Sequence, residues 1–434
     1  MQLERVVVED LSPVRKRMQV QIPASEVQSE LDRAYATVGR DARVRGFRPG
    51  HVPRSVVEKM FGDQIRREVL ARLVEHSFHH AVEEQRLDVV GAPEIDADGL
   101  TPGASLTYSA TVDVRPVITI GSTANLEVGR PQYEVSDEDV ERVLDSMRES
   151  QAQLRPIEDR TEVEAGDVVT LNLTTRLPGQ DVQRRDGVMV EAGGGAFPQA
   201  LERQLVGQHR GARLTLEVPY PADYGNPALA GKTVTFEIEL VELKAKELPV
   251  LDDDFARDHG RSESLAALRT TVRADLEQHA RTRAESAVQE AVLDQLLARH
   301  PFDVPASLVD RRCDAMLSSL DVRIPDGTEG EQVLARLRAE VRPRAEREVR
   351  ADLLLDAIAA ARGVTIDDTA VDAEIETLAQ RQQQAPERIR AFYDRPEARQ
   401  ALRTRLGRER ALAAVMSEAS IVPHATAKDV ARTD

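Results

Sequence analysis

The chain has 434 residues, of which 41% are hydrophobic and 31% are charged, and its formal net charge at pH 7 is −17. This length is too great for one hydrophobic core and predicts about three domains of roughly 150 residues each. An acidic chain is repelled by phosphates, which excludes general adhesion to nucleic acid but allows a local basic patch. The only cysteine, Cys313, excludes an intramolecular disulfide bond and fits a reducing compartment.

The first 115 residues predict an α+β domain. Met18, Val20 and Ile22 alternate with polar residues, as in a half-buried strand. Ser25 is a suitable cap for a helix in which apolar residues recur at spacings of three and four. The expected strands are residues 5–8, 15–22, 87–90 and 105–114, and the expected helices are residues 25–44, 54–61 and 64–85.

The remainder predicts a connector helix, a β-rich block and a long helical region. Ser136 is a good N-cap, and Val140, Val143, Leu144 and Met147 behind it form one apolar stripe. From about residue 262 onward we expect helices with narrow apolar stripes among Arg and Glu residues, interrupted by three breaks. The expected strands are residues 168–175, 213–218 and 233–243, and the expected helix breaks are residues 300–305, 324–330 and 363–368.

A basic segment lies between the first two predicted helices. Residues 40–67 contain eight Arg or Lys and three acidic residues, a local charge of +5 inside an acidic chain. Phe47 stands between Arg45 and Arg48, and an aromatic ring flanked by guanidinium groups can contact RNA phosphates and bases or acidic side chains. Two alternatives stay open at this point: the segment is ordinary solvated surface, or Phe47 packs back into the core.

The motif Gly-Phe-Arg-x-Gly-x-x-Pro, residues 46–53, resembles the ribosome-binding signature loop of the trigger factor family. The resemblance continues through SDEDVERVLDSMRES (136–150), KELPVLDDDFARDHG (246–260) and FDVPASLVD (302–310). It implies docking on the large ribosomal subunit near the tunnel exit, through protein and rRNA. The residues implied in ribosome binding are Arg45, Gly46, Phe47, Arg48, Pro49 and Gly50. Many family members carry another basic residue where this chain has Pro49 or His51.

The β-rich block resembles FKBP-type peptidyl-prolyl isomerases through GQHRGARLTLEVPYPADYG (207–225) and KTVTFEIELVEL (232–243). Rotation about an X–Pro bond needs no nucleophile, only a dry pocket that grips the proline ring and favours the twisted amide. Leu173, Val182 and Leu201 replace aromatics of the family, and Pro198 lacks the N–H expected at the pocket rim. We therefore expect weak activity. The pocket candidates are Tyr224, Phe236, Leu201, Phe197, Leu173 and Val182; alternatively, Tyr224 and Phe236 are simply core residues.

No cofactor or metal is expected. His76 and His80 have metal-ligand spacing on a helix, but this pattern is more typical of surface histidines. The N-terminal sequence MQLERVVVED has no basic segment followed by an apolar one, so we expect no secretion signal. The longest uncharged run, residues 99–112, contains Pro102 and Gly103 and is too short to span a bilayer. We expect a cytoplasmic protein without a membrane partner.

Together, these observations predict a multidomain α+β protein. The expected domains are a ribosome-binding domain (1–115), a connector with a helix (116–154), an FKBP-like antiparallel half-barrel with a helix (155–245) and an extended all-α chaperone domain with arms (246–434). The resemblance implies a chaperone for nascent and unfolded polypeptides, with roles in protein export and cell division, and allows a homodimer off the ribosome. The alternatives are a dedicated prolyl isomerase whose helices recruit substrate, and an envelope chaperone of similar build.

Overall fold

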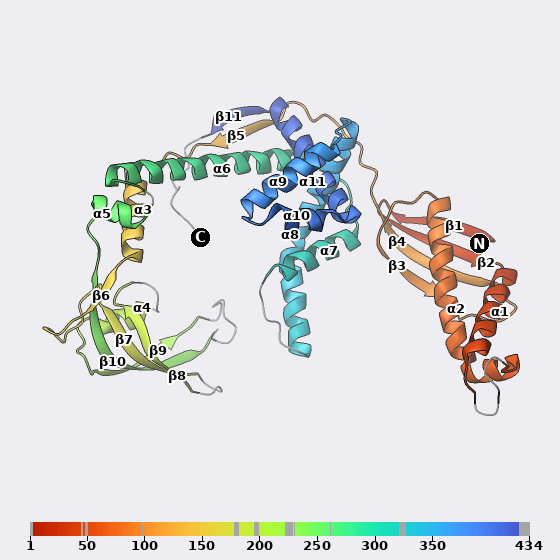
Figure 1. The fold of residues 1–434 in the computed structure, drawn as a ribbon, viewed down its shortest axis with the longest axis horizontal. Helices are drawn as coiled ribbons and strands as arrows, with labels where there is room; N and C mark the ends of the chain where they lie inside the picture. The colour runs from red at the N-terminus through yellow and green to blue at the C-terminus, as the bar shows by residue number, and fades with distance from the viewer. Residues whose placement is uncertain are drawn as a thin grey trace. The chain divides into compact units, whose positions relative to one another are not determined.

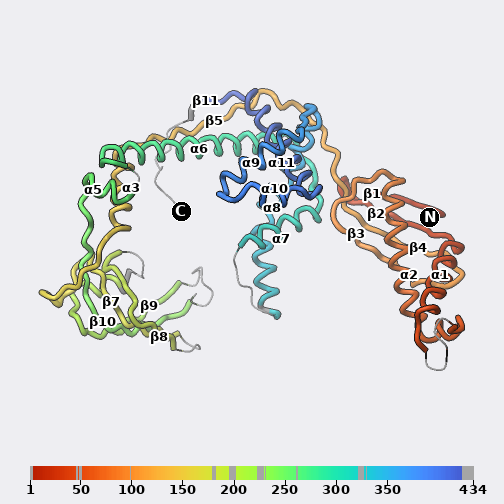
Figure 2. The backbone as a smooth tube through the Cα atoms, in the orientation of Figure 1, coloured from red at the N-terminus to blue at the C-terminus, as the bar shows by residue number. Residues whose placement is uncertain are grey.

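A computed structural model describes residues 3–44, 47, 51–97, 99–177, 182–194, 199–221, 229, 231–260, 262–320 and 327–424. The chain forms two compact units, each of which is described by itself (Figure 1, Figure 2). The first unit contains residues 1–130 and 287–423, and the second contains residues 131–286 and 424–434.

The N-terminal part of the first unit is a four-stranded antiparallel sheet with two helices against one face (Figure 1). Met18, Val20 and Ile22 are fully buried on the helix side, whereas Arg17 and Gln19, which alternate with them, are exposed on the other face. The strand order β1-β2-β4-β3 makes β1 and β3 the two edges. The elements are β1 (Arg5–Ser12), β2 (Arg15–Ile22), α1 (Ala24–Asp41), α2 (Arg54–Glu84), β3 (Val89–Ala97) and β4 (Leu106–Val114).

Two predicted elements are corrected here. The expected helices 54–61 and 64–85 are one continuous helix, α2, because Gly62 lies on its buried face, where an added Cβ would lie 3.7 Å from the Tyr35 hydroxyl of α1. Packing against α1 thus offsets the low helix propensity of glycine. The cap of α1 is Pro23 rather than Ser25, which lies in the first turn; the fixed φ of proline suits a helix start.

The edge strand β3 is longer than predicted. The sequence analysis placed this strand at residues 87–90. Gly91 and Pro93, which follow, are residues that weaken strand pairing. In the structure the pairing with β4 shifts register between Val90 and Glu94 and then continues to Ala97. The three residues between them form a bulge, and Gly91 adopts φ +83° there.

The second unit contains the connector helix and a five-stranded sheet. The prediction for Ser136 is confirmed: its hydroxyl accepts a hydrogen bond from the Asp139 N–H, and Asp139 completes a capping box. The long strand β10 pairs with β6, β7 and β9, and β8 pairs with β7. The elements are α3 (Asp137–Ser150), β6 (Gln153–Pro156), β7 (Val168–Arg176), β8 (Gln183–Glu191), α4 (Gln199–Leu205), β9 (Arg213–Pro219), β10 (Thr233–Glu247) and α5 (Asp253–Asp258).

The helical region begins with α6, whose residues fall in both units. The breaks predicted at residues 300–305 and 363–368 are confirmed: Gly363 adopts φ +63° directly after the cap of α8, and the Asp367 carboxylate caps the next helix. The break predicted at 324–330 lies partly outside the described residues, and α8 begins within it, at Thr328. Two further breaks, before Pro386 and Pro396, were not predicted. The elements are β5 (Glu127–Pro131), α6 (Leu265–Arg299), α7 (Ala306–Ser318), α8 (Thr328–Ala361), α9 (Asp368–Arg381), α10 (Pro386–Tyr393), α11 (Pro396–Glu418) and β11 (Ser420–His424), which pairs with β5.

Candidate functional site

The first candidate site is the segment that joins α1 to α2. Phe47 is 41% exposed, and its N–H donates to the Val44 carbonyl at 3.1 Å. Pro53 then forms the N-cap of α2. The described conformation therefore does not place Phe47 in the core, which was one of the two alternatives from the sequence.

Several cations near this segment lack a carboxylate partner in the described part of the chain. Arg43, Lys59 and Arg67 are exposed and take part in no ion pair there. Arg54 differs, because it pairs with Asp32 at 2.6 Å and its guanidinium lies 5.2 Å from the centre of the Tyr35 ring. The hydrogen bond from Arg54 lowers the pKa of the Asp32 carboxyl. The local positive charge predicted from sequence is therefore only partly compensated within the molecule.

The remaining predicted ribosome-binding residues lie outside the described residues: Arg45, Gly46, Arg48, Pro49 and Gly50. Of the six, Phe47 alone can be placed.

The second candidate site is the β6–β10 sheet. Phe236 on β10 and Leu173 on β7 are 8% and 7% exposed and belong to one apolar cluster. Leu173 pairs with Ile238, two residues from Phe236, so the two side chains point to the same face of the sheet. The structure thus brings together two of the predicted pocket residues. Both are largely buried, which also fits the alternative of core residues.

The other predicted pocket residues are not part of this cluster in the described chain. Val182, just before β8, is 53% exposed and lies outside the cluster. Tyr224 and Phe197 lie outside the described residues, as does the side chain of Leu201 on α4. Tyr220, which the sequence analysis did not select, is half-buried and packs against the cluster at the end of β9. The sequence signal that could have identified Tyr220 was its position in the motif VPYPADYG, which the chain shares with FKBP-type isomerases.

A hydrogen-bonded clamp holds the loop that leads into β7. The Asp167 carboxylate accepts two hydrogen bonds from the Arg160 guanidinium, at 2.6 and 2.7 Å, and one from the Glu164 N–H at 2.8 Å. Burial raises the pKa of Asp167, but the hydrogen bonds from Arg160 and Glu164 outweigh it and lower the pKa below its ordinary value. The clamp therefore depends on the charged carboxylate.

We expect Asp167→Asn to destabilise this sheet by about 1–3 kcal/mol, because the Arg160 charge loses its partner. The pKa in the folded state lies below that in the unfolded state. The contribution is therefore fully present above pH ~4 and is lost as the pH falls further through the folded-state pKa. Urea unfolding at several pH values measures this. An equal destabilisation of the variant at low and neutral pH would contradict the assignment.

The third candidate site is the helical region. Its core is divided into separate clusters. The largest packs α6, α8 and α11 around Val292, Leu354 and Val415. Smaller ones join Val371, Ile375 and Leu402, and Val309, Cys313 and Ala345. Cys313 is 2% exposed and packs in the cluster with Val309 and Ala345. Leu320 and Phe392 remain 47% and 52% exposed. Individual apolar side chains of the region therefore remain at the surface, outside these clusters.

Ion pairs between α7, α8 and α11 hold these helices together. The Asp352 carboxylate lies 2.5 Å from Arg312 and 2.8 Å from Arg408. Arg408 also pairs with Asp356 at 2.6 Å. Burial raises the pKa of Asp352 although both cations favour its charged form. Within the described ranges, no group of three or more His, Cys, Asp or Glu side chains is placed to bind a metal ion, and no helix is long and apolar enough to cross a membrane.

Comparisons with known proteins cover almost the whole chain. The family model of the bacterial trigger factor protein matches residues 4–147, that of the trigger factor C-terminus matches residues 264–417, and that of FKBP-type peptidyl-prolyl cis-trans isomerases matches residues 159–241. The trigger factor of Anaeromyxobacter dehalogenans (strain 2CP-C) is 35% identical over 426 residues, covering 96% of this chain and 99% of the relative. The chain belongs to the trigger factor family.

Two further relatives complete the comparison. The trigger factor of Geobacter metallireducens is 33% identical over 422 residues, covering 95% of this chain and 97% of the relative. A solved structure of a trigger factor chaperone is 19% identical, with a TM-score of 0.49, and the match covers 95% of this chain and 99% of that chain.

Membership in the family settles the broad function. The chain is a ribosome-associated chaperone with an FKBP-type peptidyl-prolyl isomerase domain, and as such it binds ribosomes and nascent chains. A dedicated prolyl isomerase is not favoured, because trigger factor family models match on both sides of the isomerase block. The predicted fold class, with an FKBP-like antiparallel sheet and a helical C-terminal region, is confirmed.

Proposed function

We propose that this trigger factor docks on the large ribosomal subunit, near the tunnel exit, through residues 45–50 between α1 and α2. The observation that supports the proposal is the exposed ring of Phe47 in a basic part of the sequence, where Arg43, Lys59 and Arg67 form no ion pair with any described residue. An apolar ring and guanidinium groups on one segment suit a surface of rRNA phosphates and acidic protein side chains. The cations provide attraction, and the ring provides a directional contact.

Sedimentation with purified ribosomal subunits tests this proposal. We expect the chain to co-sediment with the large subunit and not with the small one. Binding should weaken steeply between about 50 and 200 mM salt, because phosphate contacts release counterions. Co-sedimentation with the small subunit alone, or binding that does not change with salt, would contradict the proposal.

We also propose that the β6–β10 sheet catalyses prolyl isomerisation weakly. The barrier to X–Pro rotation, about 18–20 kcal/mol, is lowered by a pocket that excludes water and favours the twisted amide. Leu173 stands where related strands carry an aromatic, and Val182 is too exposed in the described conformation to grip a ring from both sides. A pocket with fewer aromatic side chains binds the twisted X–Pro amide less tightly and therefore lowers the barrier less.

We expect kcat/KM on a proline-containing tetrapeptide to be at least about tenfold below that of a standard FKBP enzyme. The double substitution Val182→Phe with Leu201→Phe should raise it about threefold to tenfold by restoring aromatic surface. Met189→Phe is the matched control, because it adds an aromatic at a 57% exposed position of β8. Wild-type efficiency equal to that of the standard enzyme would show that the substituted positions do not limit catalysis.

The helical region supplies, in our proposal, the main surface for nascent and unfolded polypeptides in the cytoplasm. Exposed apolar side chains such as Leu320 and Phe392, separated by charged ones, hold an unfolded chain through many weak contacts. A homodimer off the ribosome, and roles in protein export and cell division, stay predictions of the family resemblance.

A further inference from the structure

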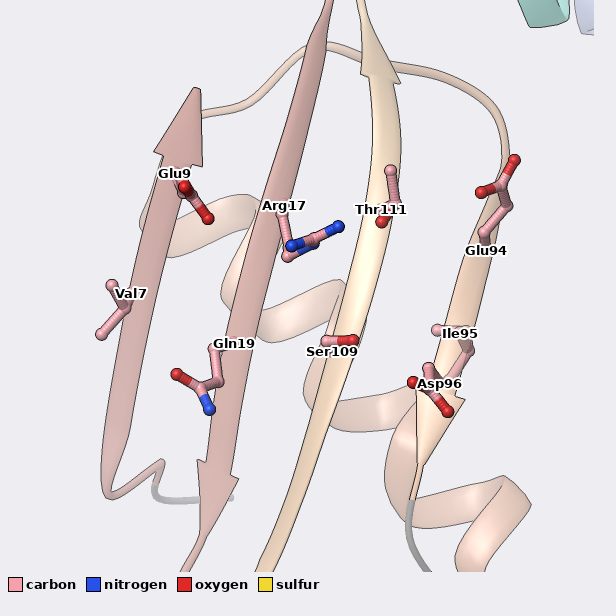
Figure 3. Close-up of a pocket in the computed structure, with 9 residues that line it drawn as sticks. All are labelled: Val7, Glu9, Arg17, Gln19, Glu94, Ile95, Asp96, Ser109 and Thr111. Carbon is pink, nitrogen blue, oxygen red and sulfur yellow. The ribbon is translucent and has the colours of Figure 1, made fainter. Parts of the chain in front are cut away.

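The N-terminal sheet has two hollows that meet at β3. We define the β3 groove as the hollow of about 600 Å³ between α2 and β3. The second hollow, also about 600 Å³, lies on the sheet face opposite the helices, where Arg17, Gln19 and Thr111 line it (Figure 3). Ile95 of β3 borders both. The apolar side chains that line the β3 groove are Ala71, Val74, Phe78, Val82, Leu87, Val89, Pro93 and Ile95.

The outer edge of β3 is open from Glu94 onward. The structure pairs β3 with β4 alone, and no hydrogen bond in the described part of the chain joins the far edge of residues 94–97 to another strand. Before the bulge the edge is covered, because the Ser307 hydroxyl donates to the Val90 carbonyl at 3.0 Å. In an antiparallel ladder alternate peptide groups point away from the partner, so the open part can pair with one more strand.

Side chains on the two sides of this edge differ in chemistry. Glu94 and Asp96 lie on the open face and share it with Glu9, and among the described residues that line this hollow Arg17 is the cation (Figure 3). The β3 groove is apolar, and its charged lining groups are the carboxylates of Glu75 and Asp88, beside His79. Arg15 pairs with Glu94 and Arg115 with Asp88. Glu75 and Asp96 form no ion pair within the described residues.

We propose that the β3 edge binds an extended segment of a client polypeptide in which apolar and basic residues alternate. A strand added at Glu94–Ala97 would direct every second side chain toward the β3 groove and the others toward the acidic open face. The first set would be aliphatic, and the second would be Lys or Arg. The inference rests on the proposed client-binding function. It assigns part of that function to the N-terminal sheet, in addition to the helical region.

A labelled peptide of four Val-Lys repeats tests the pattern in the full-length chain by fluorescence anisotropy. We expect it to bind about tenfold more tightly than a peptide of the same composition with four Val followed by four Lys, and more tightly than Val-Glu repeats. Bound peptide should slow hydrogen exchange of the amides at residues 94–97. Equal binding of the alternating and block peptides, or protection elsewhere with none on β3, would overturn the proposal.

Charge reversal at an exposed position supplies the variant. Asp96→Lys should weaken binding of Val-Lys repeats about fivefold and strengthen that of Val-Glu repeats. Glu83→Lys, on an exposed position of α2 that lines neither hollow, is the matched control and should change neither affinity. If the two variants change the peptide affinities equally, the net charge of the protein explains the effect and the proposed site is refuted.

Two further measurements separate this proposal from others. The Asp96→Lys variant should co-sediment with ribosomes as the wild type does. If it does not, the proposed docking through residues 45–50 is contradicted, whereas the peptide affinities still decide the β3 edge. If a second copy of the chain occupies the edge instead, residues 94–97 would be protected without peptide, and protection would rise with protein concentration. That outcome would overturn the assignment to client chains.

Discussion

Replacing Phe47, Arg48 and Pro49 together by alanine should abolish co-sedimentation with ribosomes, a loss of about 100-fold or more in affinity. The change removes an exposed ring, a cation and a rigid backbone position from the proposed docking segment. Contacts that bury an aromatic or an arginine often contribute about 2 kcal/mol or more each to the binding free energy. A loss of about 1.4 kcal/mol weakens the affinity tenfold. Stability should change little, because Phe47 is 41% exposed.

The matched control removes one apolar side chain and one arginine elsewhere on the same domain. Leu11 is 42% exposed on β1, and Arg33 forms only a surface pair with Glu30. Leu11→Ala with Arg33→Ala should leave ribosome binding within about twofold of wild type. If the triple variant binds as well as this control, the docking surface lies elsewhere.

Single substitutions of the flanking cations separate rRNA from protein contacts. Arg43→Ala, Lys59→Ala or Arg67→Ala should each weaken binding modestly. The slope of log affinity against log salt should fall by about one for each residue that contacts a phosphate. A variant that binds more weakly with an unchanged slope marks a contact with ribosomal protein instead.

Deletion of the isomerase sheet should leave most of the chaperone activity in place. Gln153 of β6 pairs with Glu247 of β10, so the chain enters and leaves the sheet at neighbouring positions. Residues 153–247 can therefore be replaced by a short Gly-Ser linker. The cluster of α3, α5 and α6, which includes Leu144, Phe255 and Leu268, lies outside the deletion and is kept. We expect this variant to suppress aggregation of a denatured client nearly as well as the wild type.

A chain ending at Pro249 should largely lose this suppression, because it keeps the sheet and lacks the helical region. Burial of apolar client surface contributes about 25 cal/mol per Å², and only a surplus over the ordering cost appears as binding. If the shortened chain protects the client as well as the full-length protein does, the main client surface is not helical. Circular dichroism of both variants checks that the retained parts fold.

Point substitutions test the same surface without truncation. Leu320→Ser with Phe392→Ser removes two exposed apolar side chains of the helical region, which should raise the amount of chain needed for half-maximal suppression about twofold to fivefold. Met189→Ser with Val241→Ser is the control, because these residues are 57% and 44% exposed in the second unit. Equal losses from both pairs would mean that any exposed apolar residue serves, wherever it lies.

The sequence alone determined the elements whose signals are local. Ser136 and Asp367 are side-chain caps, and their hydroxyl and carboxylate accept hydrogen bonds from N–H groups only three residues away. Alternating burial in β2 follows from the two-residue period of a strand. The signature motif at residues 46–53 and the matches along the chain indicated the family for the same reason, because they depend on residue order and not on long-range packing.

Tertiary structure decided the features in which distant residues compete with local propensity. The sequence predicted two helices, 54–61 and 64–85, but packing of Gly62 beside Tyr35 keeps α2 continuous. The strand predicted at residues 87–90 continues past Gly91 and Pro93, because pairing with β4 resumes after the bulge and creates the open β3 edge. The pocket residues needed the fold as well: Leu173 and Phe236 meet because β7 and β10 pair in register, whereas the exposure of Val182 depends on where the chain enters β8. Sequence reports local preference, and burial against residues far along the chain is strong enough to override it.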